Sequence, residues 1–298
     1  MPAPTDRESL ADATNPLGLA GIEFIEFSTP KPQALGQVLE MMGFRPIARH
    51  RSREVLLYRQ GEMNIIINAH AGGLPRAAQA SGASADPQPV IAALALRVRD
   101  AASAYRHALA LGAWGLPTHV EVMELNIPAI HGVGASRIYF VDRYDDFSIY
   151  DVDFTLIPTV DPKPAPLTGL HWFGVVQYIG NDRMEDWTEF YGVVFGFKAL
   201  ADDDRRGILP KGRVLQSPCG TFYLQLIEPE PGILDVEGDE SLQRIGLGTP
   251  DVLASVKALS ARGVGFIESK GVHSDARGAL TQSYLGSTMF ELVHDERG

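Results

Sequence analysis

The sequence contains little cysteine and no long apolar run. Its 298 residues include one cysteine, Cys219. This count excludes an internal disulfide and a zinc site built from several cysteines, and it fits a reducing compartment. No stretch approaches the roughly 20 apolar residues that span a bilayer. The opening residues, MPAPTDRESLADATNPLG, lack the apolar segment of a secretory signal. We therefore expect a cytoplasmic protein without a membrane partner.

Basic residues are outnumbered by acidic ones. Lys and Arg total 26 against 37 Asp and Glu, which gives a formal net charge of -11. Nucleic acid and anionic lipid would be repelled by this charge, so neither is an expected partner. Hydrophobic residues at 45% and charged residues at 21% are ordinary for a globular protein. A small molecule is the partner that the composition favours.

An internal repeat organises the chain. The first pair of segments reads as a strand, a turn and an amphipathic helix, and the second as a strand followed by a helix with Asp near its start and Gly after its end. The third pair reads as a hairpin that ends in an acidic strand. The paired segments are 18–45 with 169–197, 94–113 with 245–264, and 137–154 with 278–295. So long a period predicts two similar domains rather than a stacked array.

The repeat and a proline-rich stretch predict the domain boundaries. Residues 1–15 are expected to form a mobile tail, residues 16–156 an N-terminal domain, and residues 169–298 a C-terminal domain. Between the domains, residues 157–168 form a linker that proline makes stiff and extended. Each domain is expected to contain two copies of a unit made of a strand, a helix and three more strands.

Five strings in the first half carry a resemblance to a known family. They are NPLGLAGIEFIEF, ARHRSREVLLYRQGEMNIIIN, LRVRDAASAYRHALALGA, MELNIPAIHGVGASRIYFVDR and SIYDVDF. Together they resemble the first half of bacterial 4-hydroxyphenylpyruvate dioxygenases, and the chain from residue 169 resembles that family more loosely. The resemblance implies an α+β fold of the vicinal-oxygen-chelate superfamily, which also contains glyoxalase and bleomycin resistance proteins. It also implies two tandem domains of paired βαβββ modules, each with a curved mixed sheet around a cup, and a homo-oligomer.

The resemblance further implies where a metal would bind. In that family the first domain is structural, and the second holds a ferrous ion through two His and one Glu, leaving positions open for a 2-oxo acid and dioxygen. Glu291 in STMFELVHD matches the Glu ligand. Arg244 in LQRIGLGTPD stands at one His position, and Gly174 in LHWFGVVQYIGNDRM stands at the other, or Val175 if the gap is placed differently. One ligand of three remains, so no metal cofactor is expected.

The position of Arg244 within its strand indicates what replaces the metal. Side chains alternate along a strand, so Arg244 shares one face with Gly246 and Gly248, which predicts a bare cavity floor. We expect the guanidinium to occupy the cation position and to pair with Glu291, whose buried carboxylate needs compensation. The pair would either receive a small carboxylate, aromatic or 2-oxo acid or only plug an inactive cup.

Three glutamines are candidates for binding such an acid. They are Gln177, Gln225 and Gln282, each able to donate and accept hydrogen bonds. By the resemblance, Gln282 matches a substrate-contacting Gln of the family, while Gln225 stands where the family has Pro. The chain ends at Gly298, where the family has a helix that gates the site, so we expect a more open pocket.

Displaced histidines are the alternative, and they would hold Fe(II) or another divalent metal. His171 lies three residues before Gly174 and faces the other way in a regular strand, so a bulge would be needed to turn it inward. His294 lies three residues after Glu291, so in a regular strand it also faces the other way. His273 lies in a loop that could reach the cup. Replacement of both family positions by histidine, Arg244→His with Gly174→His, is expected to restore ferrous binding.

A second metal site in the first domain is not expected. By repeat position Asp151 matches Glu291, and the positions of its partners hold Ala93 and the pair Glu23–Phe24, none of which is histidine. The polar residues His119, Glu121 and Glu124 read as the exposed face of a hairpin.

Three functions follow from these observations. The first, and favoured, is a divergent family member that binds a small acid without the usual iron, as a binding protein or as an enzyme with non-oxidative chemistry. The second is an iron-dependent dioxygenase of the 4-hydroxyphenylpyruvate type with relocated ligands. The third is a catalytically silent homologue that acts through assembly with a partner. Retained iron would favour the second, metal-free binding of an acid the first, and a stable hetero-complex the third.

Overall fold

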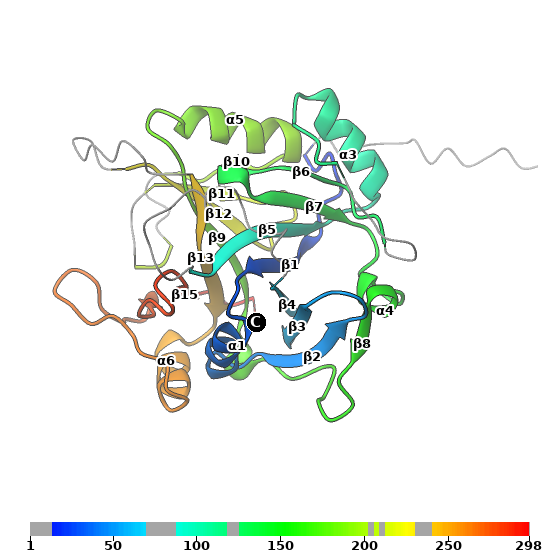
Figure 1. The fold of residues 1–298 in the computed structure, drawn as a ribbon. Helices are drawn as coiled ribbons and strands as arrows, with labels where there is room; N and C mark the ends of the chain where they lie inside the picture. The colour runs from blue at the N-terminus through cyan, green and yellow to red at the C-terminus, as the bar shows by residue number, and fades with distance from the viewer. Residues whose placement is uncertain are drawn as a thin grey trace, which may run out of the picture.

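The computed structural model describes residues 14–69, 88–117, 125–201, 206–208, 212–229 and 240–297. Most of the expected tail at 1–15, and the predicted hairpin residues His119, Glu121 and Glu124, lie outside these ranges. Strands dominate both halves of the chain, and they join into one mixed sheet (Figure 1). No described helix is long and apolar enough to cross a bilayer.

The N-terminal half forms a strongly curved sheet with three helices. Its elements are β1 (Gly21–Ser28), α1 (Pro32–Met41), β2 (Arg45–His50), β3 (Val55–Gln60), β4 (Met63–Asn68), β5 (Val90–Arg97), α3 (Ala101–Ala110), β6 (Ala129–His131), β7 (Arg137–Val141), α4 (Ile149–Asp153) and β8 (Phe154–Leu156). Strand β1 pairs parallel with β4 and antiparallel with β5, which in turn pairs parallel with β7. We call the concave side of this sheet the first cup.

The C-terminal half repeats this arrangement. Its elements are β9 (His171–Tyr178), α5 (Met184–Phe195), β10 (Lys198–Ala199), β11 (Arg213–Gln216), β12 (Tyr223–Ile227), β13 (Ser241–Thr249), α6 (Val252–Ser260), β14 (Gly278–Leu280) and β15 (Phe290–His294). Strand β9 pairs parallel with β12 and antiparallel with β13, which pairs parallel with β15. The concave side is the second cup. The observed pairing agrees with the repeat seen in the sequence.

The two halves share a sheet and a core. Leu242 at the start of β13 pairs with Ile91 of β5, which joins the two curved sheets. Helices α3 and α5 lie along one side, and α1 and α6 along the opposite side (Figure 1), so each helix pair has one member from each half. One apolar cluster contains buried residues of both halves. The cups are therefore held by a common framework.

Two helices begin as their sequences predict. Asp100 accepts a hydrogen bond from the Ser103 amide at the start of α3, and Asp251 accepts one from the Ala254 amide at the start of α6. These N-caps satisfy amides that have no partner within the helix.

One predicted element is wrong. Residues 137–154 do not form a hairpin that ends in a strand, because Ile149–Asp153 is the short helix α4. Asp151 accepts hydrogen bonds from the amide and hydroxyl of Ser148, which completes a capping box. The true counterpart of β15 is β7. Asp151 therefore caps a helix and is not the counterpart of Glu291.

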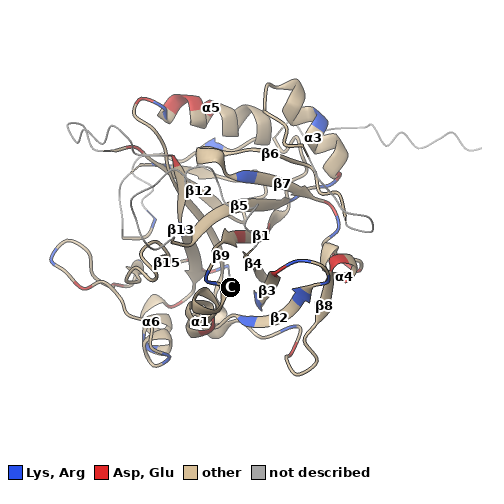
Figure 2. Ribbon diagram, in the orientation of Figure 1, with Lys and Arg blue, Asp and Glu red and all other residues tan. Residues whose placement is uncertain are grey.

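Charge is sparse on the strands at the centre of the sheet. In Figure 2 most Lys, Arg, Asp and Glu residues lie on loops, helices and outer strands, while β5, β9 and β13 are almost free of colour. Strand β9 has no charged residue, and Arg244 is the one on β13. A charge at the centre of such a sheet needs a specific partner.

Gly134 provides a test of how closely the halves meet. Its φ is +59°, and a Cβ added there would lie 1.5 Å from the carbonyl oxygen of Glu240, beside β13. Gly112 is the matched control, because its φ is +89° but no atom lies within 4 Å of an added Cβ. Gly112→Ala should cost about 1 kcal/mol of stability from backbone strain alone. Gly134→Ala should lower the midpoint of thermal unfolding more than Gly112→Ala, since a backbone carbonyl must also move. Equal losses would contradict the close contact.

Candidate functional site

Arg244 and Glu291 meet at the centre of the second cup. Arg244 lies on β13 and Glu291 on β15, and the Arg244 Nε donates to Glu291 Oε2 at 3.2 Å. Both side chains are only 5% exposed. A buried charge is tolerated when it is paired, and each of these two residues supplies the opposite charge that the other requires. The structure thus brings together the two residues that the sequence singled out.

A short segment covers this ion pair. The Ile208 amide donates a hydrogen bond to Glu291, and a Cβ added to Gly207 would lie 2.5 Å from Glu291 Oε1. Burial raises the pKa of Glu291, although Arg244 and the Ile208 amide oppose that rise. Within the described residues, the Nη2 of Arg244 has no hydrogen-bond partner. The cation is therefore held by one carboxylate and is otherwise enclosed.

The predicted bare floor is filled. A Cβ added to Gly246 would lie 3.2 Å from a ring carbon of Phe173, and one added to Gly248 would lie 2.3 Å from the His171 ring. These rings occupy the space above the glycines, so glycine here permits close packing instead of opening a cavity. Phe173 also stacks on Tyr223 of β12, with ring centroids 4.8 Å apart.

The free space that remains is small. Beside Glu291 the second cup has a cavity of about 20 Å³, which is room for about one water molecule. Two guanidinium groups lie over the Tyr223 ring, Arg206 at 4.9 Å and Arg297 at 5.2 Å from its centroid. The expected open pocket is not observed beside the ion pair, where the described residues leave this small cavity.

The three candidate glutamines lie in different places. Gln225 lines the small cavity with Glu291. Gln177 is fully buried on the opposite face of β9, where its Oε1 accepts a hydrogen bond from the Tyr191 hydroxyl at 2.8 Å. Gln282 is exposed and its side chain lies beside Gly265. The structure thus groups only Gln225 with the ion pair, because strand parity turns Gln177 away and Gln282 lies at the surface.

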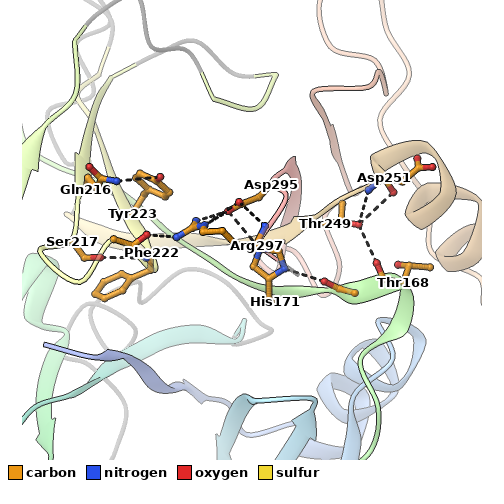
Figure 3. Close-up of polar contacts among 12 residues, drawn as sticks. Thr168, His171, Gln216, Ser217, Phe222, Tyr223, Thr249, Asp251, Asp295 and Arg297 are labelled. Atoms are coloured by element: carbon orange, nitrogen blue, oxygen red, sulfur yellow. Dashed lines mark hydrogen bonds and ion pairs between the residues drawn. The ribbon is translucent and has the colours of Figure 1, made fainter.

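A bulge in β9 turns His171 toward the second cup. Gly174 pairs with Gly246 and Trp172 pairs with Leu247, so Phe173 is the extra residue. His171 Nε2 consequently lies 3.5 Å from Asp295 Oδ2 (Figure 3). The expectation from regular alternation is wrong here, and the sequence carried no signal for the bulge.

The Asp295 carboxylate is engaged on both sides. Burial would raise its pKa, but the hydrogen bonds and charge of Arg297, together with His171, hold that pKa below its usual range. Figure 3 shows Asp295 between His171 and Arg297, with Arg297 reaching the Ser217–Phe222 turn. His171 thus lies beside the ion pair that Arg297 forms with Asp295.

The residues of the second cup do not fit an iron site. Glu291 and Asp295 are four residues apart on one strand, about 13 Å, whereas both would have to lie about 2 Å from a shared metal. His294 and His273 are exposed. The described residues contain no group of three His, Cys, Asp or Glu side chains placed to hold a metal ion.

The predicted histidine rescue also fails on geometry. A Cβ added to Gly174 would lie 1.9 Å from the carbonyl oxygen of Tyr223 on β12. That obstacle is backbone, which cannot rotate away as a side chain can. Gly174→His would therefore push β9 and β12 apart instead of providing a ligand.

The first cup differs from the second because it is open. It contains a cavity of about 430 Å³, a size typical of small-molecule sites. Its polar lining includes Glu26, Asn68, Arg137 and Tyr139. Sequence reasoning missed these residues, because the resemblance assigned a structural role to this half and the wrong counterpart was taken for Glu291.

Comparisons with known proteins agree with the fold. Residues 13–155 match the profile of the hydroxyphenylpyruvate dioxygenase N-terminal domain, and residues 169–281 match that of the glyoxalase/bleomycin resistance protein/dioxygenase superfamily. A mutant of 4-hydroxymandelate synthase from Streptomyces coelicolor superimposes with a TM-score of 0.72 over 95% of both chains, at 20% identity. This likeness shows the fold.

Two relatives are similar in sequence over most of the chain. Hemolysin VllY of Vibrio vulnificus is 34% identical over 279 residues, which are 89% of this chain and 77% of the relative. A 4-hydroxyphenylpyruvate dioxygenase of Pseudomonas aeruginosa is 33% identical over 267 residues, 86% of this chain and 73% of the relative. With the paired βαβββ modules and the two cups, these matches establish that the chain belongs to the 4-hydroxyphenylpyruvate dioxygenase family, within the vicinal-oxygen-chelate superfamily.

Proposed function

We propose that this chain is a metal-independent member of its family, one that binds a small organic acid instead of oxidising it with iron and dioxygen. The observation that carries the proposal is the buried contact between Arg244 and Glu291, 3.2 Å long. By the family resemblance these residues stand at two of the three iron-ligand positions. A guanidinium supplies a fixed positive charge next to the carboxylate, which is the electrostatic part of what a metal ion supplies.

Electrostatics opposes the entry of iron beside Arg244. Two like unit charges 4 Å apart repel by about 4 kcal/mol at an effective dielectric of 20, and a divalent ion doubles this to about 8 kcal/mol. Arginine cannot relieve the repulsion by losing its proton. A single carboxylate, Glu291, would have to offset that cost without imidazole ligands.

Iron-dependent dioxygenation by relocated ligands is the second candidate. It is favoured by the names of several relatives and by the inward position of His171. Against it, His171 already contacts Asp295, and strand geometry separates that carboxylate from Glu291. Assembly with a protein partner, homo-oligomerisation and a cytoplasmic location are proposals from sequence and resemblance alone.

The proposal predicts the outcome of iron loading. After anaerobic incubation with ferrous iron and desalting, the protein should retain far less than one iron per chain by elemental analysis. It should show no oxygen uptake that depends on 4-hydroxyphenylpyruvate. The control is His294→Gln, which changes an exposed residue. Any adventitious iron should be at the same level in this variant and in Glu291→Gln. Near-stoichiometric iron with oxygen uptake that Glu291→Gln abolishes would overturn the proposal.

The ion pair predicts a second result, in stability. Arg244→Met or Glu291→Leu alone leaves one buried charge without its partner, and each should reduce the free energy of unfolding by about 3–5 kcal/mol. The double variant should lose less than either single variant, because no charge remains to be compensated. In the exposed pair formed by Arg277 and Asp275, Arg277→Met should change stability by about 1 kcal/mol or less. Additive losses in the buried pair, measured by chemical denaturation, would show that the two residues are not coupled.

A further inference from the structure

The first cup differs from the second at one position in the middle of the sheet. In the first cup Glu26 of β1 pairs with Ala93 of β5, and Ala93 pairs with Arg137 of β7. The strand pairing of the second cup places Arg244 at the position of Ala93. A methyl group therefore replaces a guanidinium at the centre of the floor. Glu26 and Arg137 remain on either side of the gap.

The next row of the first floor is mostly aromatic. Phe24, Ala95 and Tyr139 are aligned across β1, β5 and β7, and the ring centroids of Phe24 and Tyr139 are 5.8 Å apart. Tyr139 occupies the position that Glu291 has in the second cup. The counterparts of Phe24 and Ala95 in the second cup are Gly174 and Gly246, so this row does not account for the larger cavity, and the contrast lies at Ala93 and Arg244.

The polar groups of this floor are fixed relative to one another. Asn68 Nδ2 donates to Glu26 Oε1 at 2.9 Å, and Arg137 Nη1 lies 3.9 Å from the same oxygen. Arg137 Nη1 also donates to the Tyr139 hydroxyl at 3.3 Å. Burial, and then the charge of Glu26, raise the pKa of Tyr139, so its hydroxyl keeps its proton. That hydroxyl accepts from Arg137, and no acceptor for its own hydrogen lies among the described residues.

The walls of the cavity are apolar and partly aromatic. The walls include Phe24, Ile66, Leu125, Ile127 and Phe154. The lining is polar at its two ends, which are the floor and a rim that contains His50, Arg53 and Asp153. A cavity of about 430 Å³ with apolar walls and a few fixed polar groups is the usual form of a small-molecule site.

We propose that the first cup binds a small aromatic carboxylic acid that carries a hydroxyl or ammonium group next to its carboxylate. The carboxylate would lie at Arg137 and the Tyr139 hydroxyl, the neighbouring donor at Glu26, and the ring against Phe24 and Phe154. The charges of Glu26 and Arg137 cancel. The floor therefore matches a molecule that offers, side by side, a hydrogen-bond acceptor to Arg137 and a hydrogen-bond donor to Glu26. A simple anion would leave Glu26 without a partner from the ligand.

This inference names a site and a ligand class for the acid binding proposed above. It is tested separately, because it involves no residue of the second cup. A protein that retained iron in the second cup could still bind the acid in the first. Conversely, a metal-free protein without this binding would keep the metal independence proposed above and lose the acid site assigned here.

Isothermal titration with four probes tests the ligand class. The probes are 3-phenyllactate, L-phenylalanine, 3-phenylpropanoate and 2-phenylethanol. At least one of the first two should bind, and the comparison between them assigns the donor as hydroxyl or ammonium. The propanoate, which lacks the donor, should bind about tenfold more weakly or worse, and the alcohol, which lacks the carboxylate, should bind weakest. Absence of binding by all four, or equal affinity for the first three, would overturn the assignment.

Variants of the first cup locate the binding. Arg137→Met should weaken the binding of the acid by about tenfold or more. Lys163→Met, an exposed change in the linker, is the charge-matched control and should have no effect. Ile127→Trp fills the cavity from a half-buried wall position and should abolish binding without a large shift in the thermal midpoint. If Arg137→Met and Ile127→Trp both bind the acid as the unmodified protein does, the acid binds elsewhere and the site assignment is wrong.

Discussion

The contact between Arg244 and Glu291 is the constraint on which the second cup depends. Both groups are buried, and removing either from water without the other would be costly, so the two must be present together. Their pairing leaves a compact, electrically compensated centre, over which Gly207 fits closely and Phe173 fills the space above the glycine floor. A metal ion could enter only by displacing a permanent cation. In the proposed function this pair takes the place of the metal ion, so the second cup would lack the chemistry for which family members with the full triad have ligands.

The two cups show how one architecture can hold either a filled or an open interior. Their strands pair in the same order, and even the bulge at Phe173 in β9 has a counterpart at Glu23 in β1. What differs is the central strand, which carries Ala93 in the first cup and Arg244 in the second. The smaller residue leaves space between Glu26 and Arg137, whereas Arg244, the Phe173 ring and the segment at Gly207 fill the second cup. Function thus follows the side chains at a few floor positions instead of the fold, and in this chain the open site lies in the half that the resemblance marks as structural.

Part of this account could be read from the sequence. The repeat and the caps Asp100 and Asp251 follow from patterning and local rules, and the meeting of Arg244 with Glu291 follows from the family resemblance. Three features could not be predicted. The bulge that turns His171 inward depends on pairing between distant strands, and the filling of the space above Gly246 depends on a ring from a neighbouring strand. The helix at Ile149–Asp153 was hidden by an alternating pattern typical of a strand, although Ser148 and Asp151 form a capping box.

A crystal structure of the protein soaked anaerobically with ferrous iron, and with whichever of 3-phenyllactate and L-phenylalanine binds more tightly in solution, would test the central claim most directly, because it examines both cups at once. The account predicts no metal density beside Glu291, with the contact to Arg244 intact. It also predicts density for the acid in the first cup, with its carboxylate at Arg137. Iron bound to Glu291 with Arg244 displaced, and an acid next to that metal, would contradict the account.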